Sequence, residues 1–426
     1  MTFSTFSFDR RIMAGIKSCG YAAPTPIQSQ AIPLILQGHD VMGLAQTGTG
    51  KTAAFALPIL QHILSTQAAQ GAARALILAP TRELALQINA NFHSLGRKTG
   101  VRSCSVIGGV GMGPQIKALR SSQVIVACPG RLLGLMGQGV VNLKNIDTLV
   151  LDEADRMLDM GFMPDIKRII GKLPVKRQNM LFSATMPNDI LAFAKRILVD
   201  PKTVRINATS PVKSVKHVFY KTHANAKGEV LEQLLSQDEY QNMLIFTRTK
   251  HKAKSLSRKL TNNGYNATFL QGNMSQNQRE RALNGFRQGR FTIMVATDIA
   301  ARGIDCDRIT HVVNYDMPDT VEAYTHRIGR TGRAGRSGSA ISLVTRDDAS
   351  QVRAIERVMQ ITIEPQAADV AESRSDARPA KRQSRPAKHQ SRPAKREART
   401  NPAAEKSGKP NRNRRNRSGR SRQAAA

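Results

Sequence analysis

Residues 45–52 read AQTGTGKT, and their types and spacing suit phosphate binding. Glycines let backbone N–H groups curl around a phosphate at a helix N-terminus. Lys51 would then reach the β- and γ-phosphates of a nucleotide, and the Thr52 hydroxyl would ligate Mg²⁺. An apolar run precedes the loop and a helical run follows it, as such a loop requires. Ala45 stands where the usual pattern has a glycine, so a chance loop of this composition stays open on this motif alone.

Three carboxylates follow directly on an apolar run. TLVLD ends at Asp152, and Glu153 and Asp155 come next. Acidic residues also crowd the first turn of ordinary helices, where the helix dipole favours them. A nucleotide-bound Mg²⁺ is the alternative partner, because Asp152 could join its ligand sphere and Glu153 could orient or deprotonate an attacking water. The loop and the carboxylates together predict NTP hydrolysis more strongly than either does alone.

A stretch rich in arginine and glycine, HRIGRTGRAGR, spans residues 326–336. A solvated basic loop is one interpretation. However, Arg330 and Arg333 are spaced by three with a glycine between them, so both guanidinium groups can point into one small site. An arginine of this kind accelerates phosphoryl transfer by about 10³ to 10⁵. If it sits on a separate domain, hydrolysis becomes conditional on domain closure.

The elements that would position these residues alternate along the chain. Short apolar runs alternate with helical stretches, which predicts α/β domains with parallel sheets and ligand sites at the carboxyl ends of the strands. The strand candidates are RALILAP, QVIVACP, DTLVLDE and NMLFSAT in the first half, and NMLIFTRT, NATFLQG, FTIMVATD, THVVNYD and SAISLVT in the second. We expect a first domain at residues 1–205, a linker at 206–216, a second domain at 217–365 and a tail at 366–426.

Composition limits the class of protein. The 426 residues are 40% hydrophobic, and no stretch approaches the run of about 18 apolar residues that a membrane span needs. The N-terminus lacks the apolar core of a signal peptide. Four scattered cysteines without metal-type pairs favour a reducing compartment, so we expect a cytoplasmic protein without membrane association. The net charge of +33 indicates a polyanionic partner, of which nucleic acid is the leading candidate.

The last 56 residues concentrate this charge. From Ala371 onward there are 18 Lys and Arg against 4 Asp and Glu, a net charge of +14. RPAK recurs there at a spacing of seven, but each repeat carries a proline and has no large apolar residue. This composition predicts a disordered basic tail rather than a coiled coil.

With these motifs in this order, the chain resembles the DEAD-box RNA helicases, a branch of helicase superfamily 2, over about residues 3–363. The resemblance implies two tandem RecA-like domains with ATP and Mg²⁺ as ligands, and it makes GYAAPTPIQ (residues 20–28) the adenine-reading motif. The implied catalytic residues are Lys51, Asp152, Glu153, Arg330 and Arg333, with Thr52 and Asp152 on the metal. The implied nucleotide-binding residues are Phe3, Gln28, Ala45, Gln46, Thr47, Gly48, Thr49, Gly50, Lys51, Thr52 and Asp305. Residues that would couple ATP state to RNA binding, or link the two domains, are Ser183, Thr185 and His326.

The resemblance also implies a set of RNA contacts. They fall in PTREL, GG, PGR, TRT and QNQR and at Thr297, and the residues are Pro80, Thr81, Arg82, Gly108, Gly109, Pro129, Gly130, Arg131, Arg248, Gln276, Arg279 and Thr297. Two departures stand out. Cys128 replaces the usual Thr before PGR and is a weaker hydrogen-bond donor, and residues 271–273 read QGN where the family often has HGD. Among bacterial members the N-terminus and core are most similar to the RhlE type.

The expected activity is therefore ATP-dependent unwinding of short RNA duplexes by a monomer. Aromatic residues make up only 4% of the chain and Trp is absent, so stacking platforms that read bases are scarce and binding through the RNA backbone is favoured. Structured and ribosomal RNAs are candidate substrates. An ATP-gated RNA clamp or annealing scaffold remains an alternative, whereas a P-loop signalling switch is disfavoured by the second domain and the basic charge. The tail would bind RNA or, alternatively, solubilise the protein or dock a protein partner.

Overall fold

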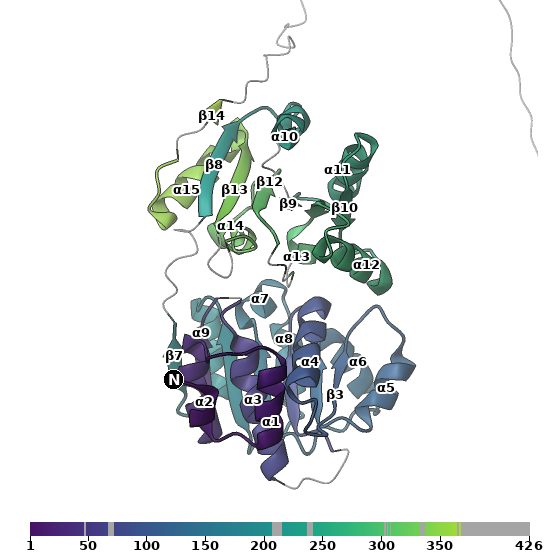
Figure 1. Ribbon diagram of the computed structural model, residues 1–426, viewed down its shortest axis with the longest axis vertical. Helices are drawn as coiled ribbons and strands as arrows, with labels where there is room; N and C mark the ends of the chain where they lie inside the picture. Colours follow the sequence, from purple (N-terminus) through teal and green to yellow (C-terminus); the bar gives the residue numbers. More distant parts are fainter. Residues whose placement is uncertain are drawn as a thin grey trace, which may run out of the picture. The chain divides into compact units, whose positions relative to one another are not determined.

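The computed structural model describes residues 1–46, 48–66, 72–206, 215–236, 242–301, 304, 306, 308–332, 337–363 and 366–367. These residues belong to one compact unit that extends over residues 1–371. It contains two sheets, each with its own helices (Figure 1).

The first sheet has seven strands in the order β3-β4-β2-β5-β6-β1-β7, and all of its pairings are parallel. Its central strands β2 and β4 are buried at every position, as expected for a sheet covered on both faces. The strands are β1 (Val41–Leu44), β2 (Ala75–Leu78), β3 (Ser103–Val106), β4 (Val124–Ala127), β5 (Thr148–Asp152), β6 (Gln178–Ser183) and β7 (Lys202–Arg205).

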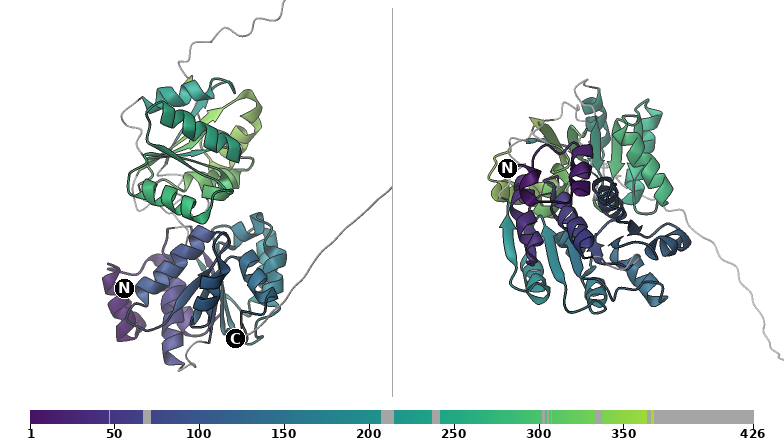
Figure 2. Two further views of the ribbon diagram at one scale, coloured as in Figure 1. Left: turned by 90° about the vertical axis from the view of Figure 1, so that its right-hand side faces the viewer. Right: turned by 60° about the horizontal axis from the view of Figure 1, so that its bottom comes forward.

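Two layers of helices cover the first sheet, and successive strand residues alternate between them. In β2, Ala75 and Ile77 pack under one layer while Leu76 and Leu78 pack under the other. Figure 2 shows the strands between purple helices on one side and teal helices on the other. The first layer contains η1 (Phe3–Phe6), α1 (Arg10–Ser18), α2 (Pro26–Leu36), α3 (Lys51–Ser65) and α4 (Arg82–Leu95). The second layer contains α5 (Met112–Leu119), α6 (Pro129–Gly137), α7 (Ala154–Asp159), α8 (Met163–Ile170) and α9 (Asn188–Ile197).

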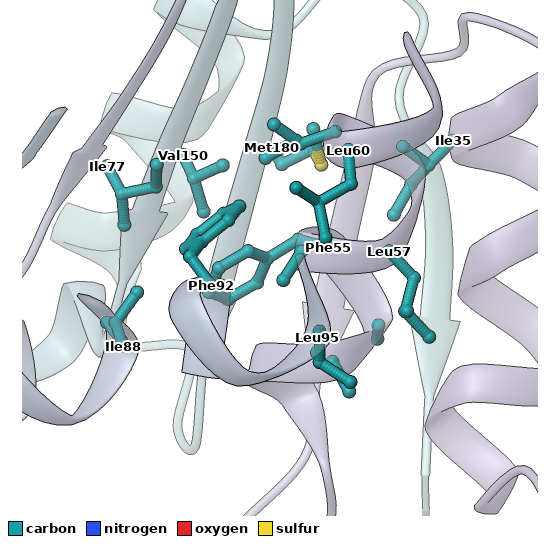
Figure 3. Close-up of a cluster of buried hydrophobic side chains, with 14 of the residues drawn as sticks. Ile35, Phe55, Leu57, Leu60, Ile77, Ile88, Phe92, Leu95, Val150 and Met180 are labelled. Carbon is teal, nitrogen blue, oxygen red and sulfur yellow. The ribbon is translucent and has the colours of Figure 1, made fainter. Parts of the chain in front are cut away.

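An aromatic cluster forms the centre of the core under the first layer. Phe55 of α3 packs against Phe92 of α4 and Phe182 of β6, with ring centroids 6.4 and 5.4 Å apart. Figure 3 shows Phe55 and Phe92 beside Ile77 and Val150 of the neighbouring strands. This packing holds the first turn of α3, and with it the phosphate-binding loop, against the sheet.

The second sheet repeats the topology of the first, with the order β10-β11-β9-β12-β13-β8-β14 and parallel pairings throughout. Its strands are β8 (Val215–Lys221), β9 (Met243–Phe246), β10 (Ala267–Leu270), β11 (Ile293–Ala296), β12 (His311–Asn314), β13 (Gly338–Val344) and β14 (Gln366–Ala367). One face is covered by α10 (Lys227–Leu235) and α11 (Lys250–Asn262). The other is covered by α12 (Gln276–Arg287), α13 (Asp298–Ala301), α14 (Val321–Ile328) and α15 (Ala349–Met359), with η3 (Arg346–Asp348) leading into α15.

The predicted α/β class with two parallel sheets is confirmed. Every predicted strand is present, and the structure adds four that the apolar pattern did not indicate: β3, β7, β8 and β14. Because β8 begins at Val215, the last two residues of the expected linker belong to a strand. Residues 207–214 and the tail from 368 onward lie outside the described residues. None of the described helices combines the length and apolarity needed to cross a bilayer.

Candidate active site and nucleic-acid interface

The phosphate-binding loop connects β1 to α3, as the motif requires. Gly50 caps α3 with φ of 92°, a left-handed conformation that glycine adopts without strain. Lys51 begins the helix, is 6% exposed, and donates from Nζ to the Ala45 carbonyl at 2.7 Å. The Thr49 hydroxyl donates to the Gln46 carbonyl at 2.7 Å. These two hydrogen bonds therefore join the end of the loop to its beginning. Thr47 lies outside the described residues.

Asp152 ends β5 and faces this loop. Burial raises the pKa of the Asp152 carboxyl to about 6, while nearby Lys51 opposes that rise and Glu153 adds to it. Lys51, Asp152 and Glu153 line a cavity of about 230 Å³ together with Gly48 and Thr52. A buried carboxylate whose charge is only partly compensated is suited to a cation entering this cavity.

The residues present fit a Mg²⁺ ion that arrives with a nucleotide. Among the described residues no cluster of three or more acidic, His or Cys side chains could hold a metal by itself. Mg²⁺ typically keeps several waters and binds one or two carboxylates plus substrate phosphates. Thr52 and Asp152 offer such a partial ligand set, which the phosphates would complete.

Glu153 is held by a buried cation that the sequence did not single out. Its carboxylate Oε2 accepts from Arg156 Nη1 at 2.7 Å, and the two side chains are 5% and 3% exposed. Glu153 has φ of 54°, an uncommon conformation for a non-glycine residue, so the backbone turns sharply at the end of β5. The feature of the sequence that could have indicated this pair is the spacing of three residues between Glu153 and Arg156 in DEADR. Arg156 thus fixes the orientation of the carboxylate proposed to act on water.

Arg156→Ala is expected to lower the free energy of unfolding of the first domain by about 3–5 kcal/mol, because it leaves a buried carboxylate without its partner. Chemical denaturation monitored by circular dichroism would measure the change. Arg168→Ala is the matched control, since Arg168 and Asp165 form an i,i+3 pair that is 3.7 Å apart, with 71% of the Arg168 side chain exposed. The control should cost less than about 1 kcal/mol. Equal losses in both variants would contradict a special role for the buried pair.

The third carboxylate, Asp155, joins the ends of β5 and β6. Its Oδ2 accepts from both the backbone N–H and the hydroxyl of Thr185, each at 2.9 Å, and the Asp155 N–H donates to Ser183 Oγ at 3.2 Å. Burial by itself would raise the pKa of Asp155, but the Thr185 hydrogen bonds hold it below its usual value. Burial lowers the pKa of His326, with Arg156 lowering it further and Asp155 opposing the shift. Ser183 and Thr185 therefore contact Asp155 directly, and the charge of Asp155 acts on His326; a coupling role for the three residues stays a prediction.

The predicted adenine-reading stretch is connected directly to the phosphate loop. Gln28 is 3% exposed; its Nε2 donates to the Gly50 carbonyl at 3.1 Å, and its Oε1 accepts from the Thr25 N–H at 2.9 Å. Phe3 is buried and stacks on Tyr21 with ring centroids 6.2 Å apart. Tyr21, not Phe3, lines the cavity. The sequence did not single out Tyr21, although it lies within GYAAPTPIQ; contact of Phe3 with adenine stays a prediction.

Arg330, at the end of α14, lines the same cavity as Lys51 and Glu153. Its Nη1 donates to the Ile304 carbonyl at 2.8 Å, and the residue is 4% exposed. Asp305 and Arg333 lie outside the described residues. Arg327, which the sequence reasoning also passed over, is buried and forms two hydrogen bonds with the Asp298 carboxylate at 2.6 and 2.7 Å. It thereby ties the start of α13 to α14, which ends two residues before Arg330.

The residues predicted to contact RNA in the first domain lie at the carboxyl ends of β2, β3 and β4. These strands are in the same sheet as β1, β5 and β6, whose carboxyl ends carry the nucleotide residues. β3, β4 and β2 are adjacent, and their ends carry the GG, PGR and PTREL stretches. Arg131 Nη1 donates to the Val110 carbonyl at 3.0 Å, which ties PGR to the GG loop. Thr81 caps α4 by accepting from the Leu84 N–H at 3.2 Å. Pro80 and Pro129 are buried, Gly130 is exposed, and Arg82 and Arg131 are half-buried.

Gly109→Ala is expected to reduce RNA affinity and RNA-stimulated ATP hydrolysis at least about tenfold, with nucleotide affinity retained. Gly109 has φ of 79°, and an added Cβ would collide with the Arg82 guanidinium, displacing a predicted RNA contact. Fluorescence anisotropy with labelled RNA and with a labelled nucleotide would measure the two affinities. Gly100→Ala is the control, because Gly100 has φ of 77° but nothing within 4 Å of the added Cβ. An equal loss in the control would mean that backbone strain, not Arg82, is responsible.

In the second sheet the predicted contacts differ in their accessibility. Arg248 is 61% exposed on its side chain, and Thr297 is half-buried at the end of β11. Gln276 and Arg279 are 1% and 5% exposed. Arg279 donates to the Glu83 carboxylate at 2.6 Å and to the Gln271 and Ala300 carbonyls at 3.0 and 3.3 Å. A direct RNA contact by Arg279 stays a prediction, and only the two N–H donors that these bonds leave over could make it while the acceptors are kept.

Comparison with known proteins agrees with this arrangement. A DEAD/DEAH box helicase family model matches residues 25–193, and a helicase conserved C-terminal domain model matches residues 226–335. The ATP-dependent RNA helicase CshA of Listeria monocytogenes is 41% identical over 86% of this chain and 70% of its own length. The ATP-dependent RNA helicase dbp2 of Neurospora crassa is 43% identical over 87% of this chain and 68% of its own length. The chain belongs to the DEAD-box family of ATP-dependent RNA helicases.

Solved structures support the same assignment. Dbp5 of S. cerevisiae bound to RNA and ADP BeF3 matches with a TM-score of 0.77 at 32% identity, covering 86% of this helicase and 96% of that chain. Mss116p bound to single-stranded RNA and AMP-PNP also has a TM-score of 0.77, at 30% identity, covering 86% of this chain and 78% of that chain.

The structure bears on one of the two departures of this helicase from the family pattern. Cys128 caps α6 without a side-chain hydrogen bond, and burial raises the pKa of its thiol to about 12, with Glu83 adding to the shift. The half-buried thiol offers only a weak hydrogen-bond donor where the family has a hydroxyl. Gln271 has a buried Oε1 without a hydrogen-bond partner among the described residues, and nothing in the structure explains the change to QGN.

Proposed function

We propose that this DEAD-box helicase binds single-stranded RNA by its sugar–phosphate backbone and separates short duplexes when ATP and RNA bind together. The observation that carries the proposal is the shared edge of the first sheet. The ends of β1, β5 and β6 carry the nucleotide residues, and the ends of β2, β3 and β4 carry the predicted RNA loops. Because these strand ends are adjacent, a change at the nucleotide can move the RNA loops through short, hydrogen-bonded connections.

The polar and charged residues Lys51, Thr52, Asp152, Glu153 and Arg330 of the cavity each have a role in this proposal. Lys51 and the backbone of the loop bind the β- and γ-phosphates, and Arg330 stabilises the charge that develops on the transferred group. Glu153, oriented by Arg156, accepts a proton from the attacking water. Thr52 and Asp152 would hold Mg²⁺, which neutralises phosphate charge and fixes phosphate geometry when bound. Arg333 and Asp305 are assigned by resemblance as a second arginine and a ribose contact.

Thr185 is proposed to transmit the state of the nucleotide site. It holds Asp155 by two hydrogen bonds, and the Asp155 backbone is next but one to Glu153. A shift of β5 on nucleotide binding would therefore move the end of β6 as well. A strand bent by domain closure no longer fits a duplex, so base pairs would separate locally, and hydrolysis would restore the open state.

The direct test measures ATP hydrolysis with and without single-stranded RNA, together with separation of a short labelled duplex. We expect hydrolysis to rise with RNA and strand separation to require ATP. An ATP-gated clamp or annealing scaffold would instead retain RNA without separating the duplex. The presence of Glu153 and Arg330 at one cavity favours turnover. Hydrolysis that RNA does not stimulate would contradict the proposal.

Finer assignments belong to the proposal as well. We infer an RhlE-type helicase that acts as a cytoplasmic monomer, with domain limits at residues 1–205 and 217–365. Structured and ribosomal RNAs are the proposed substrates. The basic tail from Ala371 is proposed to bind RNA without reading bases, because it has no aromatic residue for stacking.

Truncation at Ala371 is expected to flatten the dependence of log RNA affinity on log salt and to raise the RNA concentration that half-activates the ATPase. The tail carries a net +14, so its removal eliminates many phosphate contacts. Turnover at saturating RNA should stay within about twofold, since a tether raises local RNA concentration and leaves the chemistry unchanged. RNA titrations at several salt concentrations would measure both effects. An unchanged slope would favour a solubilising or protein-docking tail.

A further inference from the structure

Helix α11 concentrates positive charge on the second sheet. Its thirteen residues include five Lys and Arg, one His and no acidic residue. Ala253, Leu256 and Leu260 are buried against the sheet, where α11 packs on β10 and β11. The remaining positions point to either flank of this buried stripe or away from it.

The flank of α11 that faces α10 is electrically compensated. Lys252 donates to the Asp316 carboxylate at 2.7 Å, and Lys259 forms an ion pair with Glu232 of α10 at 2.8 Å. Lys252 also lies over the Tyr315 ring, 4.9 Å from its centroid. These two cations therefore have partners within the chain.

The opposite flank is not compensated. Lys250, Lys254 and Arg258 are exposed at i, i+4 and i+8, which places them on one stripe about 12 Å long. Within the part of the chain that the structure describes, none of the three has an ion pair. Like charges at i, i+4 repel one another and destabilise a helix, and solvated helix faces usually mix the two signs. A polyanion bound along the stripe would offset this repulsion.

The stripe begins at the predicted RNA edge and leads away from it. Thr249, in the predicted TRT contact, caps α11 by accepting from the Lys252 N–H at 3.2 Å. The helix then runs back along β10, which is the outermost strand of the sheet, so the free flank has no neighbouring strand beside it. Figure 1 shows α11 next to β10.

We propose that Lys250, Lys254 and Arg258 form an accessory phosphate-binding stripe for the RNA strand that continues beyond the contact loops. The proposal rests on RNA binding at those loops. It extends the footprint of the helicase and adds no base readout, because the stripe contains only cations. Its expected effect is a longer residence on extended RNA at unchanged chemistry.

The test compares two triple variants of the full chain. Lys250→Ala/Lys254→Ala/Arg258→Ala removes the stripe. Lys172→Ala/Lys176→Ala/Arg196→Ala is the matched control, since it removes two Lys and one Arg that are exposed on the first domain. Affinity is measured against salt with two single-stranded RNAs: the shortest oligonucleotide that fully stimulates the wild-type ATPase, and the same oligonucleotide extended at either end.

On the extended RNA the stripe variant should lower the slope of log affinity against log salt by about two units, at about 0.7 per lost contact. On the short RNA it should match the wild type, and kcat with saturating short RNA should stay within about twofold. The control should match the wild type on both RNAs. Equal slope losses in both variants would show a general charge effect and overturn the proposal.

Two other outcomes would also overturn it. An unchanged slope on extended RNA would leave the stripe to solvent or to an acidic protein. A loss on the short RNA would place these residues within the contact loops rather than beyond them. Failure of the proposed function is distinguishable, because the wild type would then show no stimulation by the short RNA at all.

Discussion

Glu153→Gln is expected to bind ATP with near-wild-type affinity and to hydrolyse it about 10²- to 10⁴-fold more slowly, because an amide cannot accept the proton of the attacking water. The amide oxygen can still accept from Arg156, so the fold should be retained. Blocked hydrolysis should also prolong the closed, RNA-bound state. Single-turnover hydrolysis and the rate of RNA release measured after a chase with unlabelled RNA would test both expectations.

A matched control for this variant is Glu229→Gln, since Glu229 is exposed on α10, away from the cavity. It should behave as the wild type in both measurements. Near-normal ATP turnover in Glu153→Gln would refute the assignment of Glu153 as the base. Loss of ATP binding would instead show that the neutral side chain disrupts the buried Arg156 pair and the loop beside it.

Arg330→Ala is expected to reduce RNA-stimulated hydrolysis about 10³-fold or more while changing nucleotide affinity much less. Arg330 lines the cavity with Lys51 and Glu153, so its guanidinium is placed to stabilise charge that is greater in the transition state than in bound ATP. The ATPase rate at saturating RNA and the affinity for a labelled nucleotide separate the two effects.

Two comparisons sharpen this second prediction. Arg353→Ala removes an exposed arginine of α15 and should leave both quantities unchanged. The isolated fragment of residues 1–205 keeps both helix layers of the first sheet and should fold, yet it lacks Arg330. We expect it to bind ATP weakly and hydrolyse almost none. RNA-stimulated hydrolysis by this fragment would rule out catalysis by two domains.

Local chemistry was readable from the sequence because it depends on contiguous residues. A phosphate loop needs its glycines, Lys51 and Thr52 in an unbroken order, since one turn of backbone and one helix terminus form the site. The position of Asp152 was readable for the same reason, because Asp152 is the last residue of a short buried strand. Alternation of apolar runs with helical stretches was sufficient for the α/β class and for the strands that are fully buried. β3, with its two serines, was missed because its residues do not form an apolar run.

Side-chain partnerships across the fold were not readable in this way. Arg156 and Arg327 appeared as ordinary charges, yet each is buried against one carboxylate. Phe3 and Tyr21 stack on each other, and only their packing decides which ring lines the cavity. Arg279 appeared only as an RNA contact, a role that stays a prediction, and the structure pairs it with Glu83. In each case the partner of the side chain depends on which elements of the fold pack against each other. The charge or aromaticity of a residue does not specify that packing.

By itself, the sequence determined that this protein binds a nucleotide phosphate, presents carboxylates to it and carries a large excess of positive charge. The tertiary structure decided which strand ends are neighbours. The order β3-β4-β2-β5-β6-β1 does not follow the chain, so only the sheet brings GG, PGR and Arg82 together and places them beside Asp152 and Ser183. A strand buried on both faces is a uniform apolar run, so its local pattern contains no information about its neighbours. Strand order is decided by the packing of two helix layers on the whole sheet, and that order places the RNA loops next to the nucleotide site.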